Sequence, residues 1–146
     1  MNIGSSISVV VPVFNEEENI YPLAQEIGSA LKGICDYEII FVNDSSADAT
    51  AVTLTKLKNE ISEIRVIHHS QRSGQSAGLR TGILAAKNNI IVTLDGDGQN
   101  DPADIPSLLK KYEQSHDTHF AMVTGHRVKR KDSWAKRYAS KIANTI

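Results

Sequence analysis

The chain has 146 residues, of which 40% are hydrophobic and 23% charged, and its formal net charge is −1 at pH 7. This composition is ordinary for a soluble globular protein, and the length fits one domain that buries a core without disulfides or metals. The single cysteine, Cys35, excludes an internal disulfide and favours a reducing compartment. No apolar run approaches the ~20 residues of a membrane span, and the first residues lack the pattern of a signal peptide. We therefore expect a domain that is neither secreted nor membrane-spanning.

The near-zero net charge hides an asymmetry along the chain. Residues 1–126 carry 9 basic and 16 acidic side chains, whereas residues 127–146 carry 7 basic and 1 acidic side chain. The first part therefore has a net charge of −7 and the last part a net charge of +6. A basic end of this kind suggests an anionic partner, either phosphates or a membrane surface.

The first half of the chain predicts strands and helices in alternation. Ile7–Val13 is an apolar run typical of a buried strand, with Pro12 closing its hydrogen-bonding part. A helix follows from Asn19, with Gly33 as its stop, because apolar residues recur there at helical spacing: Ile20, Leu23, Ile27 and Leu31. A second strand, Tyr37–Asn43, leads to a helix that Ser46 or Asp48 could cap and that carries Val52, Leu57 and Ile61.

The second half continues the same alternation. We expect strands at Ile64–His68, Ile90–Leu94 and Phe120–Thr124. A third helix is expected from Gln75 to Lys87, and a fourth, after Pro102, carries Ile105, Leu108, Leu109 and Tyr112. Strands separated by such helices imply right-handed crossovers, and hence an α/β fold with a mostly parallel sheet flanked by helices. No internal repeat or linker appears, so residues 1–146 are expected to form a single domain.

Two aspartates follow the fourth predicted strand directly. Asp95 and Asp97 would lie at the carboxyl end of a central parallel strand, where α/β sheets bind ligands, and could share one Mg²⁺ or Mn²⁺ ion. Gln99 could add a neutral oxygen, and Gly96 and Gly98 would let a bulky ligand approach the backbone. A phosphatase-like aspartyl nucleophile and a plain acidic turn are alternatives. A calcium loop is excluded, because its sixth and twelfth positions hold Asn100 and Pro106 instead of glycine and glutamate.

Other polar side chains should reach the same rim of the sheet. We expect the following residues to gather there: Glu16, Asp44, Asp95, Asp97 and Arg127. Asp44 could accept from a base N–H or a ribose hydroxyl, or it could serve a turn or a helix cap. Glu16 begins a glutamate run at a helix start, which also suits a structural role. Arg72 could equally reach a phosphate or stay solvated.

Some common kinds of site find no support in the sequence. The histidines show no metal-ligand spacing linked to the acids: His68, His69, His116, His119 and His126. The glycine-rich loops of phosphate-loop ATPases and dinucleotide oxidoreductases are absent. Nucleic-acid binding is also disfavoured, since aromatic stacking platforms are scarce.

Three motifs in this order resemble family 2 glycosyltransferases, most of all the polyprenyl-phosphate (dolichyl-phosphate mannose synthase-like) group. The motifs are Val11-Pro12-Val13-Phe14-Asn15-Glu16, Glu38-Ile39-Ile40-Phe41-Val42-Asn43-Asp44 and Leu94-Asp95-Gly96-Asp97-Gly98-Gln99-Asn100-Asp101-Pro102. The resemblance implies a GT-A type nucleotide-binding fold and inverting transfer of a sugar from a GDP- or UDP-linked donor to a polyprenyl phosphate. It also implies Mg²⁺ or Mn²⁺ as cofactor.

The resemblance also assigns roles to particular residues. It places the donor on Pro12, Phe14, Glu16, Val42, Asp44, Gly96, Asp97, Gln99 and Arg127, and the metal on Asp95, Asp97 and Gln99. Asp97 and Arg127 would be catalytic, the latter within Gly125-His126-Arg127, which is similar to the family's Gly-x-Arg. The chain departs from the family pattern at Asn43, where an acid is common, at Gly96 and Gly98, which replace Ala and Leu, and before Gly74, where Asn is usual. These departures concern the identity of the donor.

A lipid phosphate as acceptor would also suit the end of the chain. Such a phosphate is largely ionised at neutral pH and needs no strong general base. The basic segment Arg127–Lys141 carries Trp134, Tyr138 and Ile142 on one helical face, which indicates an interfacial helix on an anionic membrane surface; packing on its own domain is the alternative. We expect a cytoplasmic protein, peripheral on the cytoplasmic face of the membrane.

Two further expectations concern the end of the chain and the rival functions. The chain stops at Ile146, inside a predicted helix, and the resemblance implies further acceptor-site residues and carboxyl-terminal membrane helices beyond it. Rival interpretations are a family 2 enzyme with a saccharide or protein acceptor, and a non-catalytic nucleotide-binding module.

Overall fold

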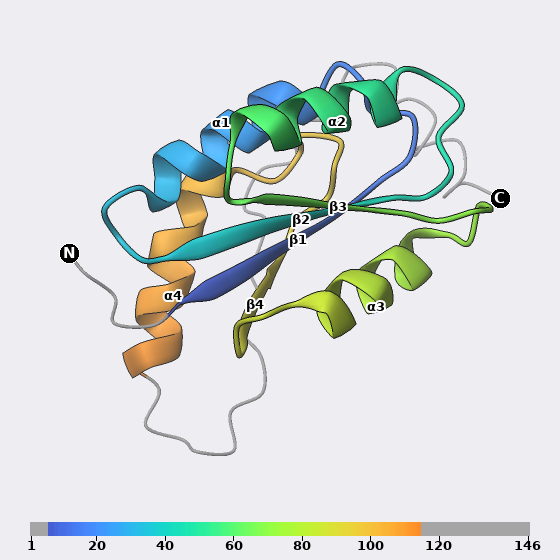
Figure 1. Ribbon diagram of the computed structural model, residues 1–146. Coiled ribbons are helices and arrows are strands. Elements are labelled where there is room, and N and C mark those ends of the chain that lie inside the picture. Colours follow the sequence, from blue (N-terminus) through green and yellow to red (C-terminus); the bar gives the residue numbers. More distant parts are fainter. Residues whose placement is uncertain (1–5, 115–146) are drawn as a thin grey trace, which may run out of the picture.

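The computed structural model of the protein describes residues 6–114, which form a sheet with helices on both faces (Figure 1). The elements, in chain order, are β1 (Ile7–Val13), α1 (Ile20–Leu31), β2 (Tyr37–Asn43), α2 (Thr50–Glu60), β3 (Ile64–His68), α3 (Gln75–Ala85), β4 (Ile90–Thr93), a 3₁₀ turn η1 (Pro102–Asp104) and α4 (Ile105–Gln114). The expected strand Phe120–Thr124 lies outside the described residues.

The four described strands run parallel in the order β3-β2-β1-β4. β1 is central and pairs with β2 on one side, Val9 opposite Ile39, and with β4 on the other, Val9 opposite Val92. Every residue of β1 is buried, as is all of β2 after Tyr37, which is why both strands are apolar almost throughout. The expected parallel α/β sheet is therefore confirmed.

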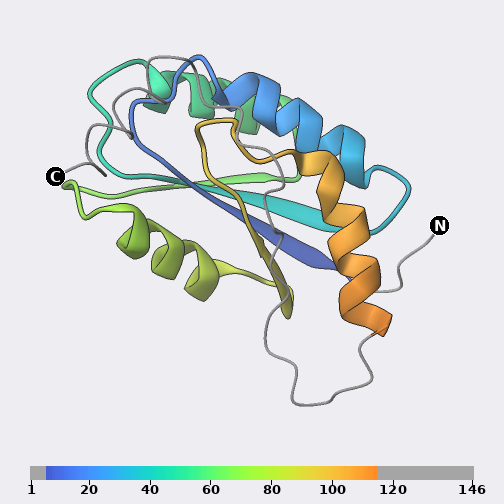
Figure 2. The same cartoon turned by 180° about the vertical axis from the view of Figure 1, so that it is seen from behind.

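The two faces of β1 are covered by different helices. Its alternate residues Ile7, Val9, Val11 and Val13 join the main hydrophobic core with residues of α1, α2 and α4. The opposite face meets α3, which lies apart from α1 and α2 across the sheet in both views (Figures 1 and 2). The β-strand period of two residues thus distributes the side chains of one strand between two helical layers.

Two glycines let α3 pack directly on the sheet. A Cβ added at Gly82 would lie 2.3 Å from Val10 Cγ1, and one at Gly78 would lie 2.9 Å from Pro12 Cβ. Both distances are shorter than real side chains tolerate. The small residues therefore set the distance between α3 and β1, and with it the position of the loop that precedes α3.

The elements differ from expectation at a few ends. α3 ends at Ala85 and not at Lys87, because the Lys87 N–H donates to Glu38 Oε1 at 2.7 Å and leaves the helical path. β4 ends at Thr93, although the Leu94 N–H still donates to Val10 O at 3.1 Å. In α2 the core contacts come from Leu54 and Leu57, whereas Val52 is 57% exposed.

The end of the sheet where the strands begin holds a polar cluster around the buried Glu38. Its carboxylate accepts from Ser8 Oγ at 2.6 Å, from the Lys87 N–H at 2.7 Å and from Arg65 Nη1 at 2.7 Å. Burial alone would raise the pKa of Glu38, but these hydrogen bonds and the charge of Arg65 outweigh it and lower the pKa below its ordinary value. The cluster ties β1, β2 and β3 to the turn between α3 and β4.

Across residues 6–114, the helices are too short or too polar for any of them to cross a membrane.

Candidate active site

A cleft of about 280 Å³ opens at the carboxyl ends of the strands. It is lined by Pro12, Val13, Phe14, Glu16, Asp44, Arg72, Gly74, Gln75, Asp95, Gly96 and Asp97. These residues come from the end of β1, from the segments that follow β1, β2, β3 and β4, and from the first residue of α3. The structure thus brings together most of the residues that the motifs single out, including three aspartates that are up to 53 positions apart.

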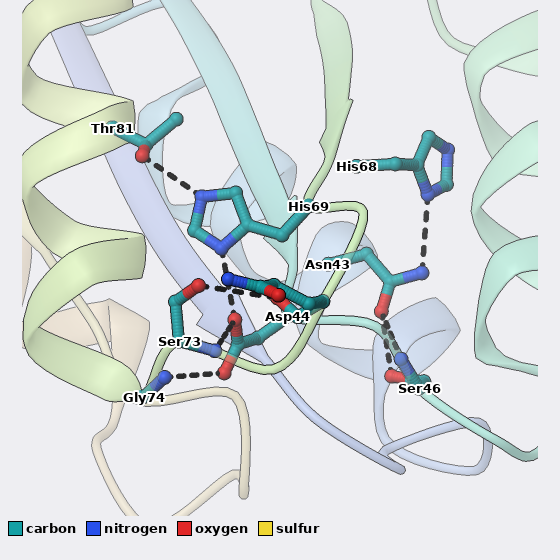
Figure 3. Close-up of polar contacts among 9 residues, drawn as sticks. Asn43, Asp44, Ser46, His68, His69, Ser73, Gly74 and Thr81 are labelled. Carbon is teal, nitrogen blue, oxygen red and sulfur yellow. Dashed lines mark hydrogen bonds and ion pairs between the residues drawn. The ribbon is translucent and has the colours of Figure 1, made fainter.

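Asp44 is the buried acid of this cleft, with only 4% of its surface exposed. Its Oδ1 accepts from the Ser73 N–H at 2.8 Å, and its Oδ2 accepts from the Gly74 N–H at 2.7 Å. His69 Nδ1 lies 2.8 Å from the same Oδ1 (Figure 3). Asp44 therefore anchors the loop between β3 and α3, which the sequence-based turn or helix-cap interpretation did not foresee.

The hydrogen bonds around Asp44 decide its protonation state. Burial would raise the pKa of this carboxyl, but the hydrogen bonds from His69 and the two backbone N–H groups, with the charge of His69, lower it below the ordinary value. An ionised carboxylate only accepts, so His69 Nδ1 must carry the hydrogen. The other ring nitrogen, Nε2, lies 2.9 Å from Thr81 Oγ1 on α3 (Figure 3).

A neighbouring network fixes the loops after β1 and β2 to each other. Asn43 Oδ1 accepts from both the N–H and the hydroxyl of Ser46, and its Nδ2 lies 3.1 Å from His68 Nδ1 (Figure 3). Ser46 Oγ in turn accepts from the Asn15 N–H at 3.0 Å. Ser46 is thus engaged here and does not cap α2, whereas Asp48 Oδ1 accepts from the N–H of Thr50, the first residue of that helix. Asn43 thus joins the two loops through its side-chain amide.

The loop after β4 presents two carboxylates to the cleft. Asp95 Oδ1 accepts from Gln75 Nε2 of α3 at 2.6 Å, and Asp97 Oδ1 accepts from the Gln99 N–H at 3.1 Å. A Cβ at Gly96 would lie 2.6 Å from Val13 Cγ1 and 3.0 Å from Pro12 O, so only glycine fits between the two acids. Two carboxylates from one loop suit a hard divalent cation, which usually keeps substrate phosphates as further ligands. Residues 6–114 contain no group of three or more His, Cys, Asp or Glu side chains that could hold a metal unaided.

Arg72 and Phe14 also line the cleft and form a wall of it. The Arg72 guanidinium carbon lies 4.1 Å from the centroid of the Phe14 ring, a cation–π contact. Glu16 also lines the cleft, and its Oε2 accepts from Asn19 Nδ2 at 2.6 Å. Arg72 is thus held against an aromatic ring and is not simply solvated.

Some motif residues lie elsewhere. The side chain of Val42 is fully buried under α3, and Gln99 is exposed but does not line the cleft. Arg127 and the basic segment Arg127–Lys141 lie outside the described residues. His69 and Gln75, which hold Asp44 and Asp95, were not predicted as site residues from the sequence. The position of His69, just after β3 at the same rim, was the available signal.

Comparison with known sequences identifies the family. Residues 8–145 match the model of glycosyl transferase family 2. The dodecaprenyl-phosphate galacturonate synthase of Rhizobium johnstonii is 36% identical, over 90% of this chain and 41% of the relative. The undecaprenyl-phosphate 4-deoxy-4-formamido-L-arabinose transferase of Proteus mirabilis is 34% identical, over 97% of this chain and 43% of the relative. The chain thus spans less than half the length of these curated relatives.

Solved structures agree on the fold. The mannosyltransferase PcManGT of Pyrobaculum calidifontis, in complex with GDP-Man and Mn²⁺, superposes with a TM-score of 0.64 at 20% identity, over 80% of this chain and 34% of that one. The glucosyl-3-phosphoglycerate synthase of Mycobacterium tuberculosis, in complex with Mn²⁺, UDP and phosphoglyceric acid, gives 0.61 at 26% identity, over 77% and 40%. The expected GT-A fold is confirmed by these neighbours. The chain belongs to glycosyl transferase family 2.

Proposed function

We propose that the protein transfers a sugar, with inversion, from a GDP- or UDP-linked donor to a polyprenyl phosphate, using Mg²⁺ or Mn²⁺. The observation that carries this proposal is the convergence of Asp44, Asp95 and Asp97 on one cleft at the carboxyl ends of the strands. Two relatives that are at least 34% identical are both named for a polyprenyl phosphate and a sugar, which supports the acceptor. The structural neighbour with 26% identity binds UDP and Mn²⁺, which supports the donor class and the metal.

The acids of the cleft suit two parts of such a donor, the nucleoside and the diphosphate. Asp44 would accept a hydrogen bond from the nucleoside, beside the wall formed by Phe14 and Arg72. Asp95 and Asp97 would hold the metal. The bound metal would neutralise the negative charge that develops on the departing diphosphate. Gln75 keeps Asp95 oriented, so the carboxylate needs little rearrangement when the donor binds. Arg127 remains proposed as a further contact to the donor phosphates.

The proposed reaction needs few further catalytic groups from the protein. The leaving group is a nucleoside diphosphate, and the catalytic problem is to stabilise its charge at the position where it forms. A phosphate acceptor is largely ionised near neutral pH, so it can attack the anomeric carbon without a strong general base. The residues at the cleft therefore need to position two anionic substrates and screen their repulsion.

The membrane surface is the remaining part of this proposal. A polyprenyl-phosphate acceptor lies in a membrane, and the basic segment Arg127–Lys141 would bring the single GT-A domain to anionic headgroups on the cytoplasmic face. Flotation with anionic vesicles at low and high salt tests this: binding at low salt and release at high salt is expected, and no binding at low salt would contradict it.

Replacement of Asp97 tests the proposed reaction. Asp97→Ala should lower metal-dependent sugar transfer to polyprenyl phosphate by at least about 100-fold, the typical effect of removing one group that stabilises the transition state. Asp104→Ala is the matched control, because Asp104 is an exposed acid of η1 that does not line the cleft. Transfer of radiolabelled sugar into the lipid fraction measures both variants. Unchanged transfer by Asp97→Ala would refute the assignment.

A further inference from the structure

The carboxylate of Asp44 has almost no acceptor capacity left. A carboxylate offers about four lone-pair positions, two on each oxygen. Oδ1 accepts from the Ser73 N–H and from His69 Nδ1, both at 2.8 Å, and is therefore saturated. Oδ2 accepts from the Gly74 N–H at 2.7 Å, which leaves it one position with respect to residues 6–114. A molecule in the cleft can place one hydrogen-bond donor on this carboxylate.

His69 keeps Oδ1 saturated whatever the charge of its ring. Nδ1 donates to Asp44, and Nε2 lies 2.9 Å from Thr81 Oγ1. A hydroxyl both donates and accepts, so Thr81 can donate to the neutral imidazole or accept from the charged one. The ring is consequently held between β2 and α3 on both sides, and its hydrogen bond to Asp44 does not depend on protonation.

The bases of nucleotides differ in the number of donors that they present to such a carboxylate. Uracil presents a single ring N–H. Guanine presents a ring N–H and an adjacent amino group, which pair fully with a carboxylate only when both oxygens are free. Cytosine and adenine can offer an amino N–H, but the adjacent ring-nitrogen lone pair then faces the negative charge of the carboxylate. One remaining position therefore matches uracil.

We propose that His69, by occupying the second acceptor position of Asp44 Oδ1, makes the cleft selective for uridine diphosphate-linked donors over guanosine diphosphate-linked ones. This inference rests on the proposed function, since it assumes that Asp44 meets the base of a nucleotide-sugar donor. His69 is a positioning residue, because it acts through Asp44. If the guanine amino group finds no acceptor on this buried carboxylate, the protein binds the guanosine nucleotide less tightly.

Calorimetric titration of the purified protein with UDP, GDP and CDP, each with Mn²⁺, tests the inference. UDP should bind at least about 10-fold more tightly than GDP or CDP, as expected when one buried donor goes unpaired. In His69→Leu the carboxylate loses one of its three anchors and gains an acceptor position, so the preference for UDP over GDP should fall below about 3-fold. His69→Asn should retain the preference, since its amide can donate where Nδ1 does.

The ratio of two dissociation constants protects the test from loss of folding. Unfolded molecules in a preparation lower the fraction of binding sites. They do not change the ratio of the dissociation constants of UDP and GDP measured on that preparation. If His69→Leu does not fold, Thr81→Val releases the far side of the ring and should reduce the same ratio. Equal or tighter binding of GDP by the wild-type protein would overturn the inference alone, as would an unchanged ratio in folded His69→Leu or Thr81→Val. If no nucleoside diphosphate binds the wild-type protein, both the inference and the proposed function fall.

Discussion

Replacement of Glu38 by glutamine should measurably destabilise the protein without touching the cleft. Glu38 lies at the end of the sheet opposite the active site, with its carboxylate held by Ser8, Arg65 and the Lys87 N–H. Glutamine keeps one oxygen that can still accept from Ser8 and Lys87. It replaces the other oxygen with an amino group, which places two donors opposite each other at Arg65.

The size of the effect follows from the exposure of the two partners. A hydrogen bond to a charged group contributes about 1.5–3 kcal/mol to the free energy of unfolding. The side chain of Glu38 is 10% exposed and that of Arg65 is 34% exposed, so solvent screens part of the attraction. We therefore expect Glu38→Gln to lose about 1–2 kcal/mol. Glu38→Ala, which strands the Ser8 hydroxyl and the Lys87 N–H, should lose about 3 kcal/mol.

The pH dependence gives the sharper check. The pKa of Glu38 is lowered in the folded state, so its contribution to stability is fully present above the unfolded pKa of about 4.3 and is lost as the pH falls through the folded pKa. The difference between wild type and Glu38→Gln should therefore be largest near pH 7 and shrink below about pH 4.

Urea denaturation followed by circular dichroism at a series of pH values measures these differences. Glu26→Gln is the matched control, because Glu26 is exposed on α1 and should show no change beyond about 0.5 kcal/mol. A Glu38→Gln variant as stable as the wild type at pH 7, or a loss equally large at about pH 3, would refute the role given to this carboxylate.

Two further predictions concern packing on the two faces of the sheet. Gly82→Ala places a methyl group 2.3 Å from Val10 Cγ1 and should cost about 1–3 kcal/mol, seen as a lower Tm, whereas a neutral result would show that α3 can move away freely. Leu54→Ala, at a fully buried site, should lower the free energy of unfolding measured in urea by about 2–5 kcal/mol. Leu84→Ala is the control, because Leu84 is 70% exposed on α3, and it should change the free energy of unfolding by less than about 0.5 kcal/mol. Equal effects at the two leucines would contradict the assignment of the core.

The sequence predicts the fold well because parallel strands are buried on both faces. Ile7–Val13 and Tyr37–Asn43 are apolar almost throughout, and the structure reproduces both expected strands residue for residue. The cleft was predictable for a topological reason, since the carboxyl ends of neighbouring parallel strands meet at one rim. Asp44, Asp95 and Asp97 lie in loops that follow two different strands of the sheet, and all of them line the cleft.

Side-chain partners far apart in sequence were not predictable in this way. His69 is 25 residues from Asp44, and their contact depends on the path of the loop after β3, for which the sequence carries no periodic signal. The same holds for Gln75 and Asp95, which are 20 residues apart. Glu38 stands within an apolar strand, and only the packed structure shows that three donors from other segments stabilise its charge.

Helix α3 links two of the acids that line the cleft. Its first residue, Gln75, holds Asp95, while Thr81 supports the histidine that fixes Asp44, and two glycines hold the helix against β1. Substitutions around Asp44 that change the base preference and substitutions in the loop after β4, which carries Asp95 and Asp97, should therefore not have independent effects. A redesign of the donor specificity would have to treat both carboxylates together, because Gly74 and Gln75, adjacent at the start of α3, hydrogen-bond to Asp44 and Asp95, and a substitution that tilts the helix displaces both contacts.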